Sequence, residues 1–315
     1  MDCVIGAKLG GTAVAALAVA ALAGCGATPA SHSDRAVASR ALDAATRSAL
    51  ATSFRANLTG SVRLSLTGVS GLPSSSLKQL TQLQQQLNSS TVAGSVEFQS
   101  PTAFATTYRF SPLLPAVVDV IEVGGVEYAS DNGTSWHLVP AASSAKKPAS
   151  LSGSLPQPLR SLAQLAGGAT AVSHLPATVV DGVSVDHLQA RISGAGLDQI
   201  LTKGLGAGPA GRSGAELQAL APLLNFGPAT IDSYISKATK RPVQESVRGA
   251  MSFNLAALGL LGSAAIPSAK GSLALRFDLT VTFSGYGSQF AITKPSDVVP
   301  GPLPTRTPPA LSSLF

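Results

Sequence analysis

Hydrophobic and polar residues alternate along two long stretches of the chain. In Leu273 to Phe283 every odd-numbered residue is large and apolar, and the residues between them are Ala, Arg, Asp or Thr. In Ala56 to Leu66 the apolar residues take the even positions, interrupted only by Gly60. Because successive side chains of a β-strand point to opposite faces, both stretches predict antiparallel strands that bury one face and expose the other.

Shorter runs predict the remaining strands of a sheet. Gly124-Gly125 separates two apolar runs, and Asp181-Gly182 interrupts the stretch from Thr178 to Ile192. Both dipeptides favour the tight turn of a β-hairpin. Further strands are expected at Val92–Gln99, Ala103–Ser111, Val117–Val123, Val126–Ala129, Ser135–Val139, Ala229–Ser236 and Val243–Phe253.

Helical spacing of apolar residues predicts a smaller number of helices. Leu77 to Leu87 carries leucines on one side and glutamines on the other, which is typical of an amphipathic helix. About nine or ten strands joined by hairpins, with a few helices, predict an α+β fold built on one large antiparallel sheet. Further helices are expected at Asp34–Ala51, Leu159–Leu165, Leu197–Leu205 and Ala215–Leu224.

Residues 1–24 have the pattern of an export signal. Lys8 precedes an apolar run from Thr12 to Ala23, which is shorter than the roughly 20 apolar residues of a membrane-spanning helix. The run ends in Leu22-Ala23-Gly24-Cys25, which resembles the bacterial lipobox, where the chain is cut before a cysteine that carries diacylglycerol. We expect Cys25 to be the lipidation site of a protein anchored on the extracytoplasmic face of the cell membrane. The alternative is an ordinary signal peptide that contains a cysteine by chance.

The same pattern divides the chain into four parts. Residues 1–24 form the signal peptide, 25–33 a polar tether, 34–299 a single domain, and 300–315 a Pro-rich tail that we expect to be disordered. Cys3 is removed with the signal peptide, so the mature chain keeps one cysteine and no disulfide is expected.

Composition adds one constraint. Charged residues make up 12% of the chain and apolar residues 45%, whereas soluble domains carry about 25% charge. This balance suits a protein whose apolar interior is larger than its own core needs. The net charge is +6, but the basic residues are scattered and form no stripe with aromatic residues. Nucleic-acid binding is therefore not expected.

No catalytic or metal-binding motif stands out. The histidines are not spaced as metal ligands, no G-x-S-x-G motif occurs, and Ser-x-x-Lys at Ser75 and Ser143 lacks the Lys-Thr-Gly partner of penicillin-binding proteins. We expect no enzyme, metal or cofactor; a Ser-His-Asp triad of distant residues stays open, since triads are recognised by geometry. We expect His137 in a strand and His174 and His187 at the surface. The chain has four histidines: His32, His137, His174 and His187.

Three local patterns have counterparts in a known family. Gly125-Val126-Glu127-Tyr128 is followed after a turn by Trp136, and the Asp181-Gly182 turn leads to Ala190-Arg191-Ile192-Ser193-Gly194. The last strand pattern is followed by Ile292-Thr293-Lys294-Pro295. With the lipobox and the first helix, these patterns resemble the LppX/LprG family of actinobacterial lipoproteins.

The resemblance implies a strongly curved antiparallel sheet, a half-barrel, with helices on its concave side that enclose a hydrophobic cavity. In this family the cavity takes acyl chains, so the expected partners are the membrane and an acylated envelope lipid or lipoglycan, with a membrane transporter as a further candidate. Segments 79–86 and 194–226 are longer than their counterparts and are either lids or fill the cavity. The apolar strand faces supply the candidate lining residues Leu58, Val62, Leu64, Phe104, Tyr108, Phe110, Val120, Leu188, Ile192, Leu275, Phe277 and Leu279.

Two other functions stay open. The chain could be a structural or interaction lipoprotein whose core is filled by its own side chains. It could also be an envelope hydrolase with an unrecognised triad. A large apolar void favours the lipid binder, a filled core favours the structural protein, and Ser and His within hydrogen-bond reach in a polar cleft favour the hydrolase.

Replacing the cysteine of the lipobox tests the predicted anchor. Cys25→Ala removes the thiol that would carry the lipid, so an unprocessed precursor or released soluble protein is expected. The measurement is detergent phase partition combined with the mass of the product. A Cys25→Ala protein that stays in the detergent phase at the mature mass would contradict the assignment.

Overall fold

The structure is a computed structural model of the chain. It describes residues 51–111, 114–130, 133–138, 171–195, 224–256 and 269–299, together with residues 40, 41, 44, 45, 48 and 49. The predicted signal peptide, Cys25, the tether and the Pro-rich tail lie outside these residues. The predicted helices Leu159–Leu165 and Leu197–Leu205, and all but the last residue of Ala215–Leu224, lie outside them as well.

The described part of the chain is mostly β. It contains thirteen strands and one complete helix, α3, with helical residues before the first strand at Ala45 and its described neighbours. In chain order the elements are β1 (Phe54–Ser70), α3 (Ser74–Ser89), β2 (Thr91–Ser100), β3 (Ala103–Ser111), β4 (Leu114–Val123), β5 (Val126–Ser130), β6 (Trp136–Leu138), β7 (Ala171–Val180), β8 (Val183–Ile192), β9 (Leu224–Phe226), β10 (Ala229–Ser236), β11 (Pro242–Asn254), β12 (Lys270–Ser284) and β13 (Val298–Val299).

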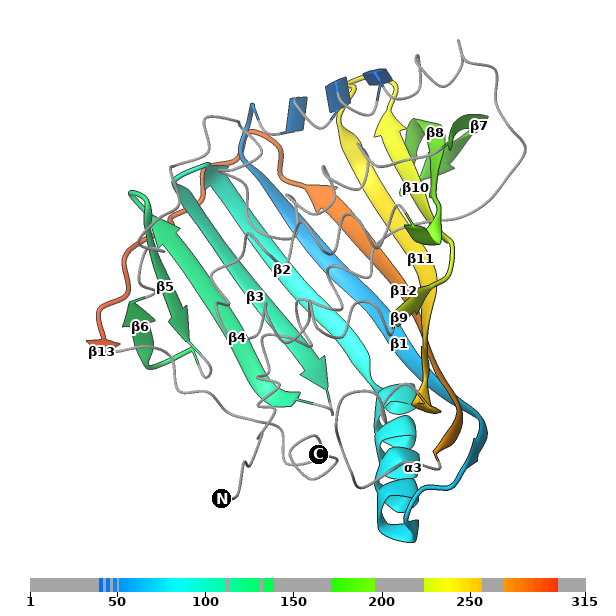
Figure 1. Ribbon diagram of the computed structural model, residues 1–315. Helices are drawn as coiled ribbons and strands as arrows, with labels where there is room; N and C mark the ends of the chain where they lie inside the picture. The colour runs from blue at the N-terminus through cyan, green and yellow to red at the C-terminus, as the bar shows by residue number, and fades with distance from the viewer. Residues whose placement is uncertain are drawn as a thin grey trace.

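All these strands belong to one open sheet (Figure 1). Its order is β13-β6-β5-β4-β3-β2-β1-β12-β11-β10-β8-β7, and β9 pairs with β11 beside this path. The pairings are antiparallel except for the short parallel contact of β13 with β6. Figure 1 shows the sheet twisting so that β7, β8 and β10 curl away from the plane of β2 to β4. The predicted large antiparallel sheet is confirmed.

Two hairpin turns form where the sequence predicts them. Gly124 and Gly125, between β4 and β5, have φ values of 63° and 80°. Asp181 and Gly182, between β7 and β8, have φ values of 47° and 80°. Positive φ at both central residues matches the twist of the flanking strands, and glycine or aspartate tolerates it better than most residues.

The pairing of β1 with β12 brings the two clearest alternating stretches side by side. Ala56 lies opposite Phe283 and Leu66 opposite Leu273, in one continuous register. In an antiparallel pair, residues directly opposite share a face, so the even positions of β1 lie with the odd positions of β12. These are the better buried positions of both strands, whereas Arg276 and Asp278 between them are exposed. The predicted faces are confirmed.

The described residues are mostly β, and they confirm the predicted helix Leu77–Leu87 within α3. An α+β chain with several helices was expected, but the described residues contain a single complete helix. That helix, α3, buries Leu80 and Leu87 and leaves Leu77 40% exposed. It lies at the end of the sheet where β1 ends and β2 begins, not across the middle of the sheet (Figure 1).

One predicted strand was too short, and two strands were not predicted. β7 begins at Ala171 rather than at Thr178, because its first half pairs with β8 before a register shift between Leu175 and Thr178. β9 and β13 were missed, and Leu224, the predicted end of a helix, is the first residue of β9. Strands of two or three residues are too short to show a period, and their pairing partners are distant in the sequence.

Within the part of the chain that the structure describes, no helix is both long enough and apolar enough to cross a lipid bilayer.

A charge on either face of β12 tests this arrangement. Phe277 is 3% exposed, so Phe277→Asp places an unpaired carboxyl in the core and should lower the free energy of unfolding by roughly 3–5 kcal/mol. Thr280→Asp is the matched control on the opposite face. It should change stability by no more than about 1 kcal/mol, since it loses only the 3.2 Å contact between the Thr280 and Ser246 hydroxyls. Equal urea midpoints for the two variants would refute the face assignment.

Candidate functional site

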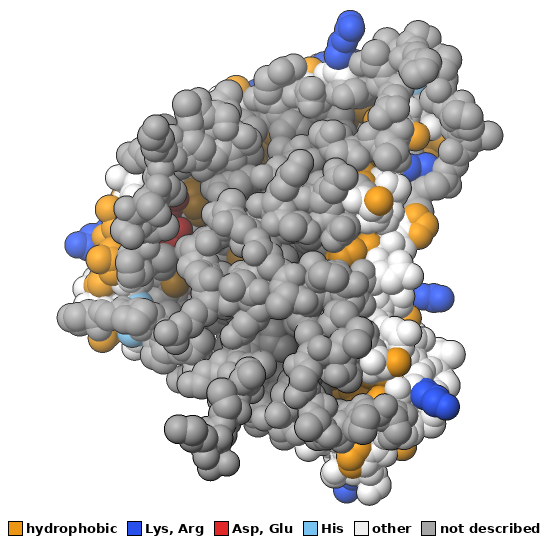
Figure 2. Space-filling model, viewed as in Figure 1, with side chains coloured by type: hydrophobic (Ala, Val, Ile, Leu, Met, Phe, Trp, Pro, Cys, Tyr) orange, Lys and Arg blue, Asp and Glu red, His pale blue; other side chains and the backbone are white. Residues whose placement is uncertain are grey.

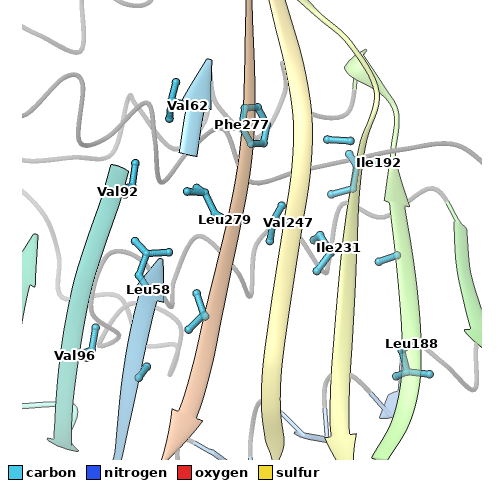
Figure 3. Close-up of a cluster of buried hydrophobic side chains, with 14 of the residues drawn as sticks. Leu58, Val62, Val92, Val96, Leu188, Ile192, Ile231, Val247, Phe277 and Leu279 are labelled. Atoms are coloured by element: carbon cyan, nitrogen blue, oxygen red, sulfur yellow. The ribbon is translucent and has the colours of Figure 1, made fainter. Parts of the chain in front are cut away.

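One face of the sheet is apolar across seven strands. Neighbouring residues in the strand register form a row that crosses the sheet, and every member except its glycine is buried. The row consists of Val92, Gly60, Leu279, Val247, Ile231, Ala190 and Val172, from β2, β1, β12, β11, β10, β8 and β7 in that order. Figure 3 shows Val92, Leu279, Val247 and Ile231 among the side chains of this cluster. We call this surface the apolar face.

Glycines on the apolar face let large side chains lie flat. A Cβ at Gly249 would overlap the Phe277 ring and the Cβ of Ala229, and a Cβ at Gly60 would overlap Leu279. Phe277 and Leu279 therefore lean over the neighbouring strands instead of standing upright.

The apolar face is where the strand register places the predicted lining residues. Most are buried, while Tyr108, Val120 and Leu275 are half-buried, and the side chain of Phe110 lies outside the described part. The register joins them across the sheet: Leu58 lies opposite Val281, Val62 opposite Phe277, and Leu64 opposite Leu275. The buried members are Leu58, Val62, Leu64, Phe104, Leu188, Ile192, Phe277 and Leu279.

The apolar face is not covered evenly. Leu66, Leu273 and Leu275, near the end of the sheet where α3 lies, are only partly buried against the cluster, as are Phe283 and Tyr286 at the opposite end. Among the described residues outside the sheet, Ala45, Leu83 and Leu87 pack against it. In Figure 2, hydrophobic side chains reach the surface along the right-hand margin, with Lys and Arg side chains between them.

A carboxyl group on the apolar face was missed by sequence reasoning. Glu245 on β11 is 7% exposed and lies between Val281 of β12 and Ser233 of β10, which is 2% exposed. The signal was present in the sequence, because Val243, Val247, Met251 and Phe253 take the odd positions of this strand and Glu245 interrupts them.

Burial raises the pKa of the Glu245 carboxyl from 4.5 to about 7. No side chain of the described residues hydrogen-bonds to it. Tyr286 lies close enough for the Glu245 charge to help burial raise the pKa of its phenol, but the Tyr286 hydroxyl donates to the Pro242 carbonyl at 2.7 Å. The Arg241 guanidinium lies over the Tyr286 ring, 5.2 Å from its centroid. The carboxyl is therefore neutral in the folded protein below about pH 7.

A second buried carboxyl, Asp232 on β10, faces the opposite side of the sheet. It is 1% exposed and accepts hydrogen bonds from His187 Nε2 at 2.9 Å, Gln189 Nε2 at 2.9 Å and Arg248 Nη2 at 2.7 Å. Burial alone would raise the pKa of Asp232, but the three hydrogen bonds outweigh it and lower the pKa. His187 also stacks on Tyr234 with ring centroids 4.4 Å apart. Asp232 is thus a charged group that its neighbours satisfy.

The histidines do not assemble a catalytic site within the described residues. His187, expected at the surface, is instead partly buried in the Asp232 cluster and has no hydrogen bond with a described serine. His174 is exposed, as expected, and His137 lies in β6, also as expected, where it is buried. No group of three or more His, Cys, Asp or Glu side chains among the residues described could hold a metal ion.

The chain is similar to several solved structures of low sequence identity. LprF from Mycobacterium bovis is 12% identical, with a TM-score of 0.39 over 85% of this chain and 99% of that one. The Mycobacterium tuberculosis lipoprotein LppX is 11% identical, with a TM-score of 0.35 over 82% and 99%. The MucA/MucB complex from Pseudomonas aeruginosa is 10% identical, with a TM-score of 0.33 over 83% and 62%.

LprF and LppX are lipoproteins of the kind that the sequence patterns resemble. Because every TM-score is below 0.5, the fold described above rests on the strand pairing itself. No family model and no curated protein matches the chain.

The buried carboxyl on the apolar face predicts a dependence of stability on pH. The pKa of Glu245 is higher in the folded than in the unfolded state, so its contribution is complete below pH 4.5 and is lost as the pH rises through about 7. The shift corresponds to about 3 kcal/mol. Glu245→Gln should remove this loss, and its free energy of unfolding should exceed that of the unmodified protein above pH 7.

Urea denaturation between pH 4.5 and pH 8 measures the difference. Glu97→Gln is the matched control, since Glu97 is an exposed carboxylate paired with Arg55. It should follow the unmodified protein. Parallel pH profiles for Glu245→Gln and the unmodified protein would show that Glu245 is not buried as described.

Proposed function

We propose that the protein is a lipid-anchored, extracytoplasmic lipoprotein that binds the acyl chains of envelope lipids or lipoglycans on its apolar face and carries or presents them. The observation that carries the proposal is the apolar face itself, which runs across seven strands of an open sheet and has partly exposed leucines at one end. The lipobox at Cys25 supports the location and the anchor, with the membrane as the first partner. An acylated ligand and a membrane transporter are the further proposed partners.

The mechanism would be physical and not enzymatic. Each buried CH₂ contributes about 0.8 kcal/mol, so exposing two long acyl chains to water costs roughly 20 kcal/mol. A dry apolar face replaces the bilayer interior with little net change in free energy, so a lipid could enter and leave. Helices on the concave side and an enclosed cavity, as the family resemblance implies, would complete the site.

Phe277 and Leu279 fit this proposal because they lie flat over Gly249 and Gly60. Their side chains add apolar surface to the middle of this face. The partly buried residues Leu66, Leu273 and Leu275 offer the tails an apolar margin that the described elements do not fully cover.

A filled core is the second candidate, and one observation favours it. Val247 is 0% exposed and Leu279 1% exposed. If the protein's own side chains fill the interior, the chain is a structural or interaction lipoprotein. Binding experiments separate the two.

Protein that lacks Cys25, exported in an envelope-competent host, tests lipid binding directly. We expect diacyl or triacyl lipid to co-purify with it and to be detected by mass spectrometry. The delipidated protein should then take up a fluorescent acyl probe in a saturable way. Protein that is free of lipid, takes up no probe and is equally stable would establish the filled core.

A matched pair of variants on β12 locates the binding face. Leu275→Asp puts a charge on the half-buried margin of the apolar face and should weaken probe binding by about tenfold or more. Ala274→Asp puts the same charge one residue away on the opposite face and should leave probe binding unchanged. Thermal unfolding of both variants would reveal any loss of fold, and equal probe affinities would contradict the proposed face.

A further inference from the structure

Glu245 and Ser233 form a polar pair inside an otherwise apolar row. The row runs Leu58, Val281, Glu245, Ser233 and Leu188 across β1, β12, β11, β10 and β8. Every member of this row is buried, and the two polar residues lie directly opposite each other on adjacent strands. Their side chains therefore point to the same side of the sheet, toward the apolar cluster.

The pair lacks partners within the described residues. No hydrogen bond from a described side chain reaches either the Glu245 carboxyl or the Ser233 hydroxyl. Leaving a buried polar group unpaired costs about 1–3 kcal/mol, and buried polar groups in native proteins have a partner in the protein, in water or in a ligand. Asp232, on the opposite face, is by contrast a buried carboxyl with partners, since three side chains donate hydrogen bonds to it.

The pair lies near one end of the apolar face. Val281 is two residues from the half-buried Phe283, a distance of about 7 Å along an extended strand. Beyond it lie Tyr286 and the turn between β10 and β11, where Lys237, Lys240 and Arg241 are located. The partly buried leucines near α3 lie at the other end. The apolar cluster continues past the pair to Phe54, Ile235 and Phe283, so the pair is a polar position within the apolar face.

We infer that Glu245 and Ser233 bind an uncharged hydroxyl of the acylated ligand within the apolar face. This inference rests on the proposed lipid-binding function and adds one polar contact to it, beside the apolar surface of Val247 and Met251. The carboxyl and the serine hydroxyl together can donate to and accept from one hydroxyl. An amphiphile with an anionic group at this position is disfavoured.

The charges around the pair agree with a neutral partner. The Glu245 charge would act on Tyr286, whose hydroxyl is already bound to the Pro242 carbonyl, and the Arg241 guanidinium lies over the Tyr286 ring. Lys237 and Lys240 lie 3.9 and 3.5 Å from the carboxylate of Asp186, whose single negative charge offsets one of their two positive charges. Because burial keeps the Glu245 carboxyl neutral below about pH 7, it can donate a proton to a hydrogen bond with an alcohol oxygen.

Competition for a bound fluorescent acyl probe tests the inference. The competitors are dioleoylglycerol, its methyl ether, which lacks the free hydroxyl, and dioleoyl phosphatidate, which carries an anionic group there. The unmodified protein should bind dioleoylglycerol about tenfold more tightly than the methyl ether, as for one hydrogen bond to a buried group. In Glu245→Leu the two should compete equally, whereas Glu245→Gln and the opposite-face control Gln244→Leu should keep the preference.

The outcomes separate this inference from the proposed function. Equal competition by dioleoylglycerol and its methyl ether in the unmodified protein would overturn the inference and leave lipid binding intact. Stronger competition by the phosphatidate would overturn it too. Failure of the probe to bind in a saturable way would overturn both.

Discussion

The apolar face has to be kept out of water, and the arrangement of the other elements follows from that constraint. Alternation in β1 and β12 puts all their large apolar side chains on one side, and the strand register extends this surface to β11, β10 and β8. Burial of such a surface supplies most of the favourable free energy of folding. The opposite side carries Thr, Ser, Asn and Arg side chains, so it can face water without loss.

The two buried carboxyls show that the ionisation state of a buried acid depends on which side of the sheet it faces. Asp232 has three donors around it and stays ionised, whereas Glu245, in an apolar setting, is driven toward its neutral form. The same burial therefore yields a structural anion in one place and a hydrogen-bonding group without a described partner in the other. Fixed ion clusters stabilise a fold, whereas a buried polar group with no partner among the described residues is the more informative sign of a ligand.

The central strands could be predicted from the sequence because their period is a local property. Leu273 to Phe283 and Ala56 to Leu66 need no knowledge of their neighbours to show which side is buried. β9, β13 and the first half of β7 could not be found this way, because distant partners define them. Glu245 was visible as a break in the alternation of its strand, but only the register of β10 and β11 places Ser233 opposite it. The position of α3 at the end of the sheet likewise depends on tertiary packing.

The pairing of β1 with β12 has a consequence for the order in which the chain can fold. β1 is the first strand of the sheet and β12 is close to the end of the chain, yet they are direct neighbours. A chain that emerges from its N-terminus, from a ribosome or from a translocation channel, has to hold β1 without this partner until nearly all of it has appeared. Contacts of such long sequence separation slow folding and leave strand edges open in the meantime. Nascent β1 and β2 would thus depend on a holding factor, or on each other, before the sheet is completed.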